Sequence, residues 1–245
     1  MHFVVFGQTR TGSSLLMDTL QAHPQVQCDV NSGEILHSNH WRRGVKLCLR
    51  PLPRRFPELY VLWKAVRSAR PVYGFKLLHH QTAAPGRLLA GLHRCGWLVI
   101  HVQRRRLFDL ALSQQVAQST GHYGDYRLIK QPDHMTIDIP PDSFLRQMRQ
   151  CIDIRRSELR SLTGIAHVSV VYEGDLLAEA DRNRICRAIV EALHLERYPI
   201  ITPRSRSWNR PYHEIVANYA RLVATAQTDE GLALRAEWDS LFEAE

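Results

Sequence analysis

The sequence predicts an α/β fold, with a mainly parallel β-sheet flanked by helices in a single domain that spans residues 1–245. Two observations favour this class. Short apolar runs alternate with amphipathic segments along the whole chain, as in a parallel sheet covered by helices. Hydrophobic residues make up 44% of the 245 residues, which is enough to form one full core.

Each element is predicted from a local pattern. Strands are predicted where short runs are rich in branched and aromatic residues, at residues 2–6, 72–78, 97–102 and 167–172. Helices are predicted where apolar residues recur every three or four positions, at residues 13–22, 86–95, 105–119, 142–163 and 181–195, with a helical region after residue 213. In the helix 142–163 the residues expected to face the core are Phe144, Leu145, Met148, Ile152 and Leu159, and those expected to face water are Arg146, Arg149, Arg156 and Arg160.

Three segments lack a regular pattern and contain many prolines, glycines or basic residues: 31–71, 120–141 and 202–213. Long loops in compact domains are often functional, and we interpret the first two as loops on the substrate side. For the first we expect loops and short helices. The third contains Arg204, Arg206 and Trp208, and it is either a loop that closes over a phosphorylated ligand or an exposed basic loop.

The net charge of +8 favours a polyanionic partner, which could be nucleic acid, an anionic membrane or a phosphorylated small molecule. Because the arginines are scattered and no recognition motif is present, we do not expect nucleic-acid binding. No apolar run approaches the ~20 residues that span a bilayer, and no secretory signal is evident, so we expect a cytoplasmic protein without a transmembrane segment. The five cysteines form no CxxC pair and are expected to be free thiols rather than zinc ligands.

The first apolar run ends in a glycine-bounded loop, Gly7 to Gly12, followed by Ser13 and Ser14. A strand, a glycine loop and a helix together direct backbone N–H groups at an anion. This pattern predicts a nucleotide-binding core like that of P-loop proteins, although a plain strand-to-helix turn is the alternative. Ser13 stands where a triphosphatase has lysine, and Asp175 is the nearest candidate for a magnesium-holding aspartate. A triphosphatase is therefore disfavoured.

A second group of candidates follows the apolar run 97–102. Arg105 stands at its exit, and Ser113 lies eight residues later, about 12 Å along a helix. Three consecutive arginines at a helix start oppose the helix dipole, which favours a bound anion there over an ordinary basic helix start.

These two stretches, RTGSSLL (10–16) and RRLFDLALS (105–113), together resemble the sulfotransferases that use 3′-phosphoadenosine-5′-phosphosulfate (PAPS). VVYEGDLL (170–177) resembles a later segment of that family. NSGEILH (31–37) resembles the bacterial carbohydrate branch, which includes trehalose and nodulation-factor sulfotransferases. The motifs occur in family order from residue 3 to about 195. Arg10 stands in place of the lysine of many members, and Arg106-Leu107 in place of the usual Asn-Pro or Asp-Lys.

The resemblance assigns a role to each matching residue. The 5′-phosphosulfate would be bound by Arg10, Thr11, Gly12, Ser13 and Ser14, and the 3′-phosphate by Arg105 and Ser113. Lys76 would lie near the transferred group, and Arg10 would stabilise the leaving oxygen. Glu34 is the first candidate for the general base, with His79 or His80 as alternatives. Tyr172 and Glu173 are expected to have a structural role, and no metal is expected.

The predicted activity is transfer of a sulfuryl group from PAPS to a hydroxyl of a carbohydrate, glycolipid or related small molecule, leaving adenosine 3′,5′-bisphosphate. The alternatives are a P-loop-like small-molecule kinase or nucleotide-binding protein, a basic nucleic-acid-binding protein, and a catalytically inactive scaffold. The sequence does not predict the oligomeric state.

Overall fold

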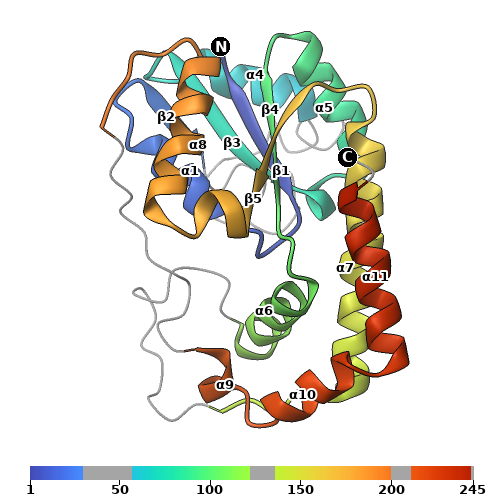
Figure 1. The fold of residues 1–245 in the computed structure, drawn as a ribbon. Helices are drawn as coiled ribbons and strands as arrows, with labels where there is room; N and C mark the ends of the chain where they lie inside the picture. The colour runs from blue at the N-terminus through green and yellow to red at the C-terminus, as the bar shows by residue number, and fades with distance from the viewer. Residues whose placement is uncertain (30–56, 122–135, 200–210, 244–245) are drawn as a thin grey trace. The chain divides into compact units, whose positions relative to one another are not determined.

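A computed structural model describes residues 1–29, 57–121, 136–199 and 211–243 (Figure 1). The chain forms two compact units. The sheet unit comprises Met1–Gln103 and Ser157–Pro203, and the helical unit comprises Arg104–Arg156 and Arg204–Glu245. The predicted α/β class is confirmed, with a parallel sheet flanked by helices.

The sheet has five parallel strands in the order β2-β3-β1-β4-β5. The strands are β1 (Phe3–Gly7), β2 (Val26–Asp29), β3 (Val72–Leu78), β4 (Leu98–Gln103) and β5 (His167–Val171). The four strands predicted from apolar runs are confirmed within one residue at each end. β1 lies in the centre and is fully buried, which explains why FVVFG has no polar position.

Helices cover both faces of this sheet (Figure 1). Alternate residues of β1 supply the two cores: Phe3 and Val5 pack with α1 (Ser13–Gln21) and α8 (Glu179–Ala192), whereas Val4 and Phe6 pack with α4 (Pro57–Val66) and α5 (Pro85–Arg94). The predicted helices 13–22, 86–95 and 181–195 are thus confirmed with small shifts of their ends. α4 lies inside the segment 31–71, where short helices were expected.

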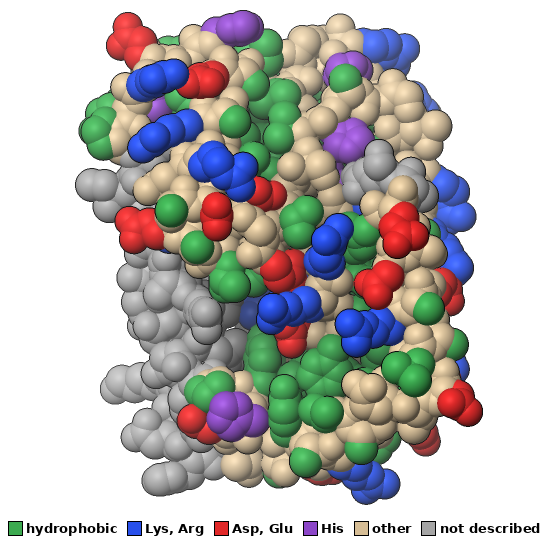
Figure 2. All heavy atoms as spheres, in the orientation of Figure 1, with side chains coloured by type: hydrophobic (Ala, Val, Ile, Leu, Met, Phe, Trp, Pro, Cys, Tyr) green, Lys and Arg blue, Asp and Glu red, His purple; other side chains and the backbone are tan. Residues whose placement is uncertain are grey.

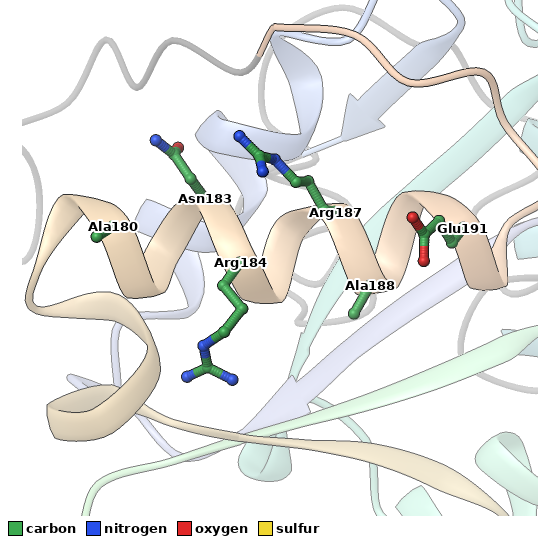
Figure 3. Close-up of a pocket in the computed structure, with 6 residues that line it drawn as sticks. All are labelled: Ala180, Asn183, Arg184, Arg187, Ala188 and Glu191. Carbon is green, nitrogen blue, oxygen red and sulfur yellow. The ribbon is translucent and has the colours of Figure 1, made fainter.

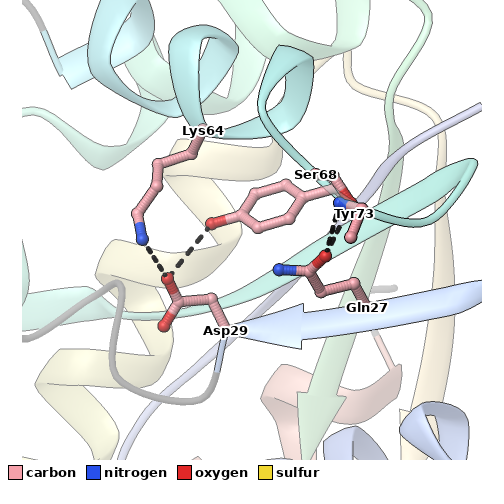
Figure 4. A network of polar contacts seen from close by, with 6 residues as sticks. Gln27, Asp29, Lys64, Ser68 and Tyr73 are labelled. Atoms are coloured by element: carbon pink, nitrogen blue, oxygen red, sulfur yellow. Dashed lines mark hydrogen bonds and ion pairs between the residues drawn. The ribbon is translucent and has the colours of Figure 1, made fainter.

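β2 was not predicted, because its four residues VQCD contain no apolar run and are too few for their alternation to stand out. Polar contacts hold it instead (Figure 4). The Asp29 carboxylate accepts a hydrogen bond from the Tyr73 hydroxyl at 3.4 Å and pairs with Lys64 at 3.0 Å. The Gln27 side-chain oxygen accepts a hydrogen bond from the Ser68 hydroxyl at 3.0 Å. An edge strand can therefore form here with little apolar burial of its own.

The helical unit contains α6 (Leu107–Thr120), most of α7 (Pro141–Leu162), α9 (Tyr212–Ile215), α10 (Tyr219–Ala226) and α11 (Asp229–Glu243). Apolar side chains from all five helices form one core that includes Trp238. Residues 136–140, the described end of the segment 120–141, join this unit through a backbone bridge between Ile137 and Val216.

The predicted faces of α7 are largely confirmed. Phe144, Leu145, Met148 and Ile152 are buried, Leu159 is half-buried, and all four arginines expected in water are exposed. Two further charged residues of this helix, Arg155 and Glu158, are buried, with 0% and 1% of their surface exposed. The helical period alone did not predict that burial.

Two short turns follow strands at the carboxyl edge of the sheet: a 3-10 turn at His79–Gln81 and a π-helical turn at Tyr172–Leu176. Among the described helices, none combines the length and apolar character needed to cross a bilayer.

Candidate functional site

The loop between β1 and α1 lies at the carboxyl edge of the sheet, because β1 ends at Gly7 and all strands run parallel. The strand order reverses at β1, since β2 and β3 lie on one side of it and β4 and β5 on the other. Ligands of open α/β sheets bind at such a point. A Cβ at Gly7 would lie 2.3 Å from the backbone oxygen of Val102 in β4. Glycine is therefore required for β1 to end this close to its neighbour.

The loop backbone adopts a left-handed conformation at two positions. Gly12 has φ 94° and is the N-cap of α1, and Arg10 has φ 68°. A Cβ at Gly12 would also lie 2.6 Å from the Tyr172 ring, so this ring packs directly against the loop. A left-handed conformation costs a non-glycine residue roughly 1–2 kcal/mol, and residues held in this way concentrate at ligand sites. The spacing of the glycines did not predict the strain at Arg10.

The hydroxyl groups of the loop take different positions. The Thr11 side chain is fully buried, and its hydroxyl donates to the backbone oxygen of Gln8 at 2.9 Å, which closes the loop on itself. Ser13 is 5% exposed, and Ser14 is half-buried. Within the described residues no side chain caps α1, and its first turn has no acidic residue. The first turn therefore suits an anion held by backbone N–H groups.

Lys76 reaches this loop from β3. Lys76 pairs with Val5 of β1 in the sheet register. Because Val5 packs against α1, the Lys76 side chain lies on the same face of the sheet. The Lys76 ammonium group donates a hydrogen bond to the Ser14 hydroxyl at 3.1 Å. The structure thus brings a strand lysine to the first turn of α1, which directly follows the glycine-bounded loop. The role of Lys76 near a transferred group stays a prediction.

His79 and His80 follow β3 directly. Their rings are in edge contact, with centroids 5.8 Å apart; His79 is half-buried and His80 is exposed. Burial lowers the pKa of His79 below its ordinary value, and the nearby Glu158 carboxylate partly offsets this effect. A neutral imidazole at neutral pH can accept a proton, as a general base must.

Arg105 and Ser113 belong to the helical unit. Arg105 is exposed and lies in the short link between β4 and α6, whereas Ser113 is inside α6 and is 1% exposed. Asp109, four residues after Arg105, pairs with the two flanking arginines, Arg104 at 3.9 Å and Arg106 at 3.8 Å. The prediction that one nucleotide contacts both the loop and Arg105 stays a prediction.

Sequence reasoning missed the partners of Arg105. Trp238 of α11 donates a hydrogen bond to the backbone oxygen of Arg105, and Phe242 lies beneath its guanidinium group. No local signal links these residues, because they stand more than 130 positions apart. The other predicted site residues, Glu34, Arg204, Arg206 and Trp208, lie outside the described residues.

Asp175, the candidate for a metal-holding aspartate, has a structural role. Its carboxylate accepts a hydrogen bond from the backbone N–H of Val171 at 2.8 Å and pairs with Arg184 at 3.0 Å. Among the described residues, no three His, Cys, Asp or Glu side chains are grouped so that they could hold a metal ion.

An open hollow of about 450 Å³ lies on α8 and is lined by Ala180, Asn183, Arg184, Arg187, Ala188 and Glu191 (Figure 3). None of these residues was predicted to bind a ligand, and Arg184 points away from Asn183 and Arg187 to pair with Asp175 and Asp181. We therefore locate the candidate site at the carboxyl edge of the sheet. Basic and acidic side chains are mixed on the face in Figure 2. That mixture does not form a continuous basic surface.

A comparison with protein-family models finds no match, and neither does a comparison with curated protein sequences. Solved structures match across almost the whole chain. A sulfotransferase domain from the curacin biosynthetic pathway superposes with a TM-score of 0.52 at 9% identity, covering 96% of each chain. The chain has the fold of a sulfotransferase domain.

Two further sulfotransferase structures align over similar lengths. The sulfotransferase from Alicyclobacillus acidocaldarius has a TM-score of 0.46 at 13% identity, covering 96% of this chain and 97% of that one. The sulfotransferase domain of the Synechococcus PCC 7002 olefin synthase has a TM-score of 0.49 at 12% identity, covering 96% and 94%. The superposition with the curacin-pathway domain, at 9% identity, shows the fold alone, and the chemistry must be argued from the residues of this chain.

Proposed function

We propose that the chain is a sulfotransferase that moves a sulfuryl group from PAPS to a hydroxyl of a carbohydrate, glycolipid or related small molecule. The observation that carries the proposal is the 3.1 Å contact between Lys76 and Ser14, which joins a strand lysine to the glycine-bounded loop in a chain with the sulfotransferase fold. The choice of acceptor rests on the resemblance of residues 31–37 to the carbohydrate branch.

The loop fits the phosphosulfate end of PAPS. Sulfuryl transfer resembles phosphoryl transfer, in that negative charge spreads over the equatorial and leaving oxygens. Fixed cations and N–H groups stabilise that charge. When bound, PAPS supplies an activated sulfuryl group whose leaving group is a phosphate. Arg10 would hold that phosphate, the first turn of α1 would donate N–H groups to it, and Lys76 would stabilise the transferred group.

Gly12 and Thr11 would act through the backbone. The Thr11 hydroxyl already donates to Gln8, so its contribution to binding would be the shape of the loop. The hydroxyl proton of the acceptor would be taken by Glu34, His79 or His80. Both histidines are described, and the lowered pKa of His79 keeps its imidazole neutral near pH 7.

The exposed Arg105 would bind the 3′-phosphate and so separate PAPS from nucleotides such as 5′-AMP and ATP. Ser113 would contribute less, because only 1% of its surface is exposed. The segment 202–213, with Arg204, Arg206 and Trp208, would close over the nucleotide. No metal ion is required by this donor set, because arginine and lysine supply the positive charge.

Calorimetry tests the nucleotide part of the proposal. Adenosine 3′,5′-bisphosphate, 5′-AMP and ATP are titrated into the wild-type chain and two variants, with and without magnesium. We expect the wild type to bind the bisphosphate at least about tenfold more tightly than 5′-AMP without magnesium, because a charge-assisted contact contributes about 1.5–3 kcal/mol. Arg105→Ala should abolish this preference.

Arg106→Ala is the matched control, because Arg106 is adjacent and 69% exposed, and should keep the preference. Tightest binding to ATP with magnesium would favour a kinase instead. Once bisphosphate binding is established, transfer of radiolabelled sulfate from PAPS into cell extracts identifies the acceptor. The base is then the residue among Glu34, His79 and His80 whose replacement by alanine suppresses transfer while sparing bisphosphate affinity.

A further inference from the structure

The link Arg104–Arg106 lies between β4, which ends at Gln103, and α6, which begins at Leu107. A link of this kind usually allows its side chains several conformations. In the helical unit, however, two side chains from the C-terminal helix α11 contact Arg105, one at its backbone and one at its guanidinium group.

The backbone contact comes from Trp238. Its indole N–H donates a hydrogen bond of 2.6 Å to the backbone oxygen of Arg105. The indole is 1% exposed and belongs to the core of the helical unit, so its position is fixed by packing. A buried donor of this kind holds the peptide between Arg105 and Arg106 in one orientation.

The side-chain contact comes from Phe242, one helical turn further along α11. The Arg105 guanidinium lies over the Phe242 ring at 5.5 Å from its centroid, and the Arg155 guanidinium lies at 4.7 Å from the same centroid. Arg155 is fully buried, so the half-buried ring packs against one guanidinium group from the interior. The exposed Arg105 lies over the same ring.

We propose that Trp238 and Phe242 are positioning residues that hold Arg105 ready for a phosphate, so that the C-terminal helix sets the preference of the chain for a 3′-phosphorylated nucleotide. The inference rests on the proposed function, because it takes Arg105 as the 3′-phosphate ligand. Stacking on a ring leaves the edge of a guanidinium group open, and its N–H groups remain able to donate to phosphate oxygens.

The physical gain is preorganisation. An arginine free in solvent samples many rotamers and loses that freedom on binding, which lowers the affinity for its ligand. Stacking on Phe242 removes part of that cost beforehand, and the Trp238 hydrogen bond fixes the backbone from which the side chain extends. The effect should apply only to ligands that contact Arg105. It should therefore alter the ratio of two affinities rather than nucleotide affinity in general.

The experiment measures the affinity of adenosine 3′,5′-bisphosphate and of 5′-AMP for the full chain by calorimetry. Phe242→Leu removes the ring but keeps apolar volume, and should lower the bisphosphate preference about two- to fivefold, as expected for loss of a cation–π contact. Phe242→Tyr keeps the ring and should retain the preference. Trp238→Phe removes the N–H donor together with part of the buried ring system and should lower the preference similarly. Leu232→Ala, at an exposed position of α11, is the control and should change nothing.

The result that supports the inference is a selective loss of bisphosphate affinity in Phe242→Leu and Trp238→Phe, with 5′-AMP affinity unchanged and the thermal midpoint within a few degrees. If Arg105→Ala abolishes the preference but both α11 variants keep it, the inference is overturned and the proposed function stands. If wild type shows no preference, both are overturned. Should Trp238→Phe unfold the chain, the Leu and Tyr variants of Phe242 alone decide the matter.

Discussion

The two regions predicted to bind the ends of one nucleotide are built by different means. The loop after β1 is shaped by its own backbone, through the close approach at Gly7 and the left-handed conformations of Arg10 and Gly12. The link that carries Arg105 has an ordinary backbone and is held by Trp238 and Phe242 of a distant helix.

This difference explains which region a sequence can reveal. Glycine is required wherever a Cβ would collide or the backbone turns left-handed, so a backbone-built loop leaves a pattern of fixed spacing. An arginine that is held by side chains distant in sequence shows no local sequence pattern apart from the arginine itself. Substitutions should therefore affect the two regions differently, with loss of folding in the first and loss of selectivity in the second.

The largest effect is expected at Gly12. Gly12→Ala should lower the free energy of unfolding by about 2–4 kcal/mol, because it adds left-handed strain to a collision with the Tyr172 ring. Urea denaturation measures this value. Gly96→Ala is the matched control, since Gly96 has φ 78° and a Cβ added there would meet no atom within 4 Å, and should cost only about 1–2 kcal/mol. Equal losses in the two variants would contradict a loop built by close packing.

Lys76 tests the contribution of a side chain to the backbone-built loop. Lys76→Met removes the charge while the loop keeps its shape, so sulfuryl transfer from radiolabelled PAPS should fall about 100-fold or more. Affinity for adenosine 3′,5′-bisphosphate, which lacks the sulfuryl group, should change far less. A variant that loses both in equal proportion would show that Lys76 binds the nucleotide and has no selective effect on transfer.

Thr11 tests whether the loop is closed from within. Thr11→Val keeps the shape of the side chain but leaves the Gln8 oxygen without its 2.9 Å donor, which should cost about 1–2 kcal/mol in thermal or urea unfolding. Thr11→Ser keeps the donor and should cost less. Thr163, an exposed residue whose hydroxyl donates to Leu159, provides the control, and Thr163→Val should change stability by less than about 0.5 kcal/mol.

The smallest effect is the pH dependence from His79. Its pKa in the folded chain is below the ordinary 6.5, because burial disfavours the charged ring. The unfolded chain therefore binds this proton more readily, and stability should be highest above pH 6.5 and decline as the pH falls toward the folded pKa. His79→Gln should reduce the loss of stability between pH 7 and pH 5. His80→Gln, at the exposed neighbour, serves as the control; a similar flattening there would assign the effect elsewhere.

Prediction from sequence was correct where the residues of a short segment determine its structure by their own apolar character. The apolar runs of β1 and β4 are buried whatever surrounds them, and the apolar face of α7 is confirmed at Phe144 and Ile152. Sequence patterns did not predict β2, which is held by contacts with Lys64 and Tyr73. They also did not predict the burial of Arg155 and Glu158 in an otherwise amphipathic helix. Those outcomes depend on partners that lie far away along the chain.

The sequence by itself determined the alternation of strands and helices and the glycine loop after β1, because each follows from local sterics and apolar periodicity. The candidate phosphate ligands came from the resemblance to a family and stay a prediction. Only the tertiary structure decided that Lys76 of β3 contacts Ser14 of α1, that Arg10 is held left-handed, and that α11 contacts Arg105. Contacts between residues distant in sequence depend on how whole elements pack, and no local pattern encodes that packing.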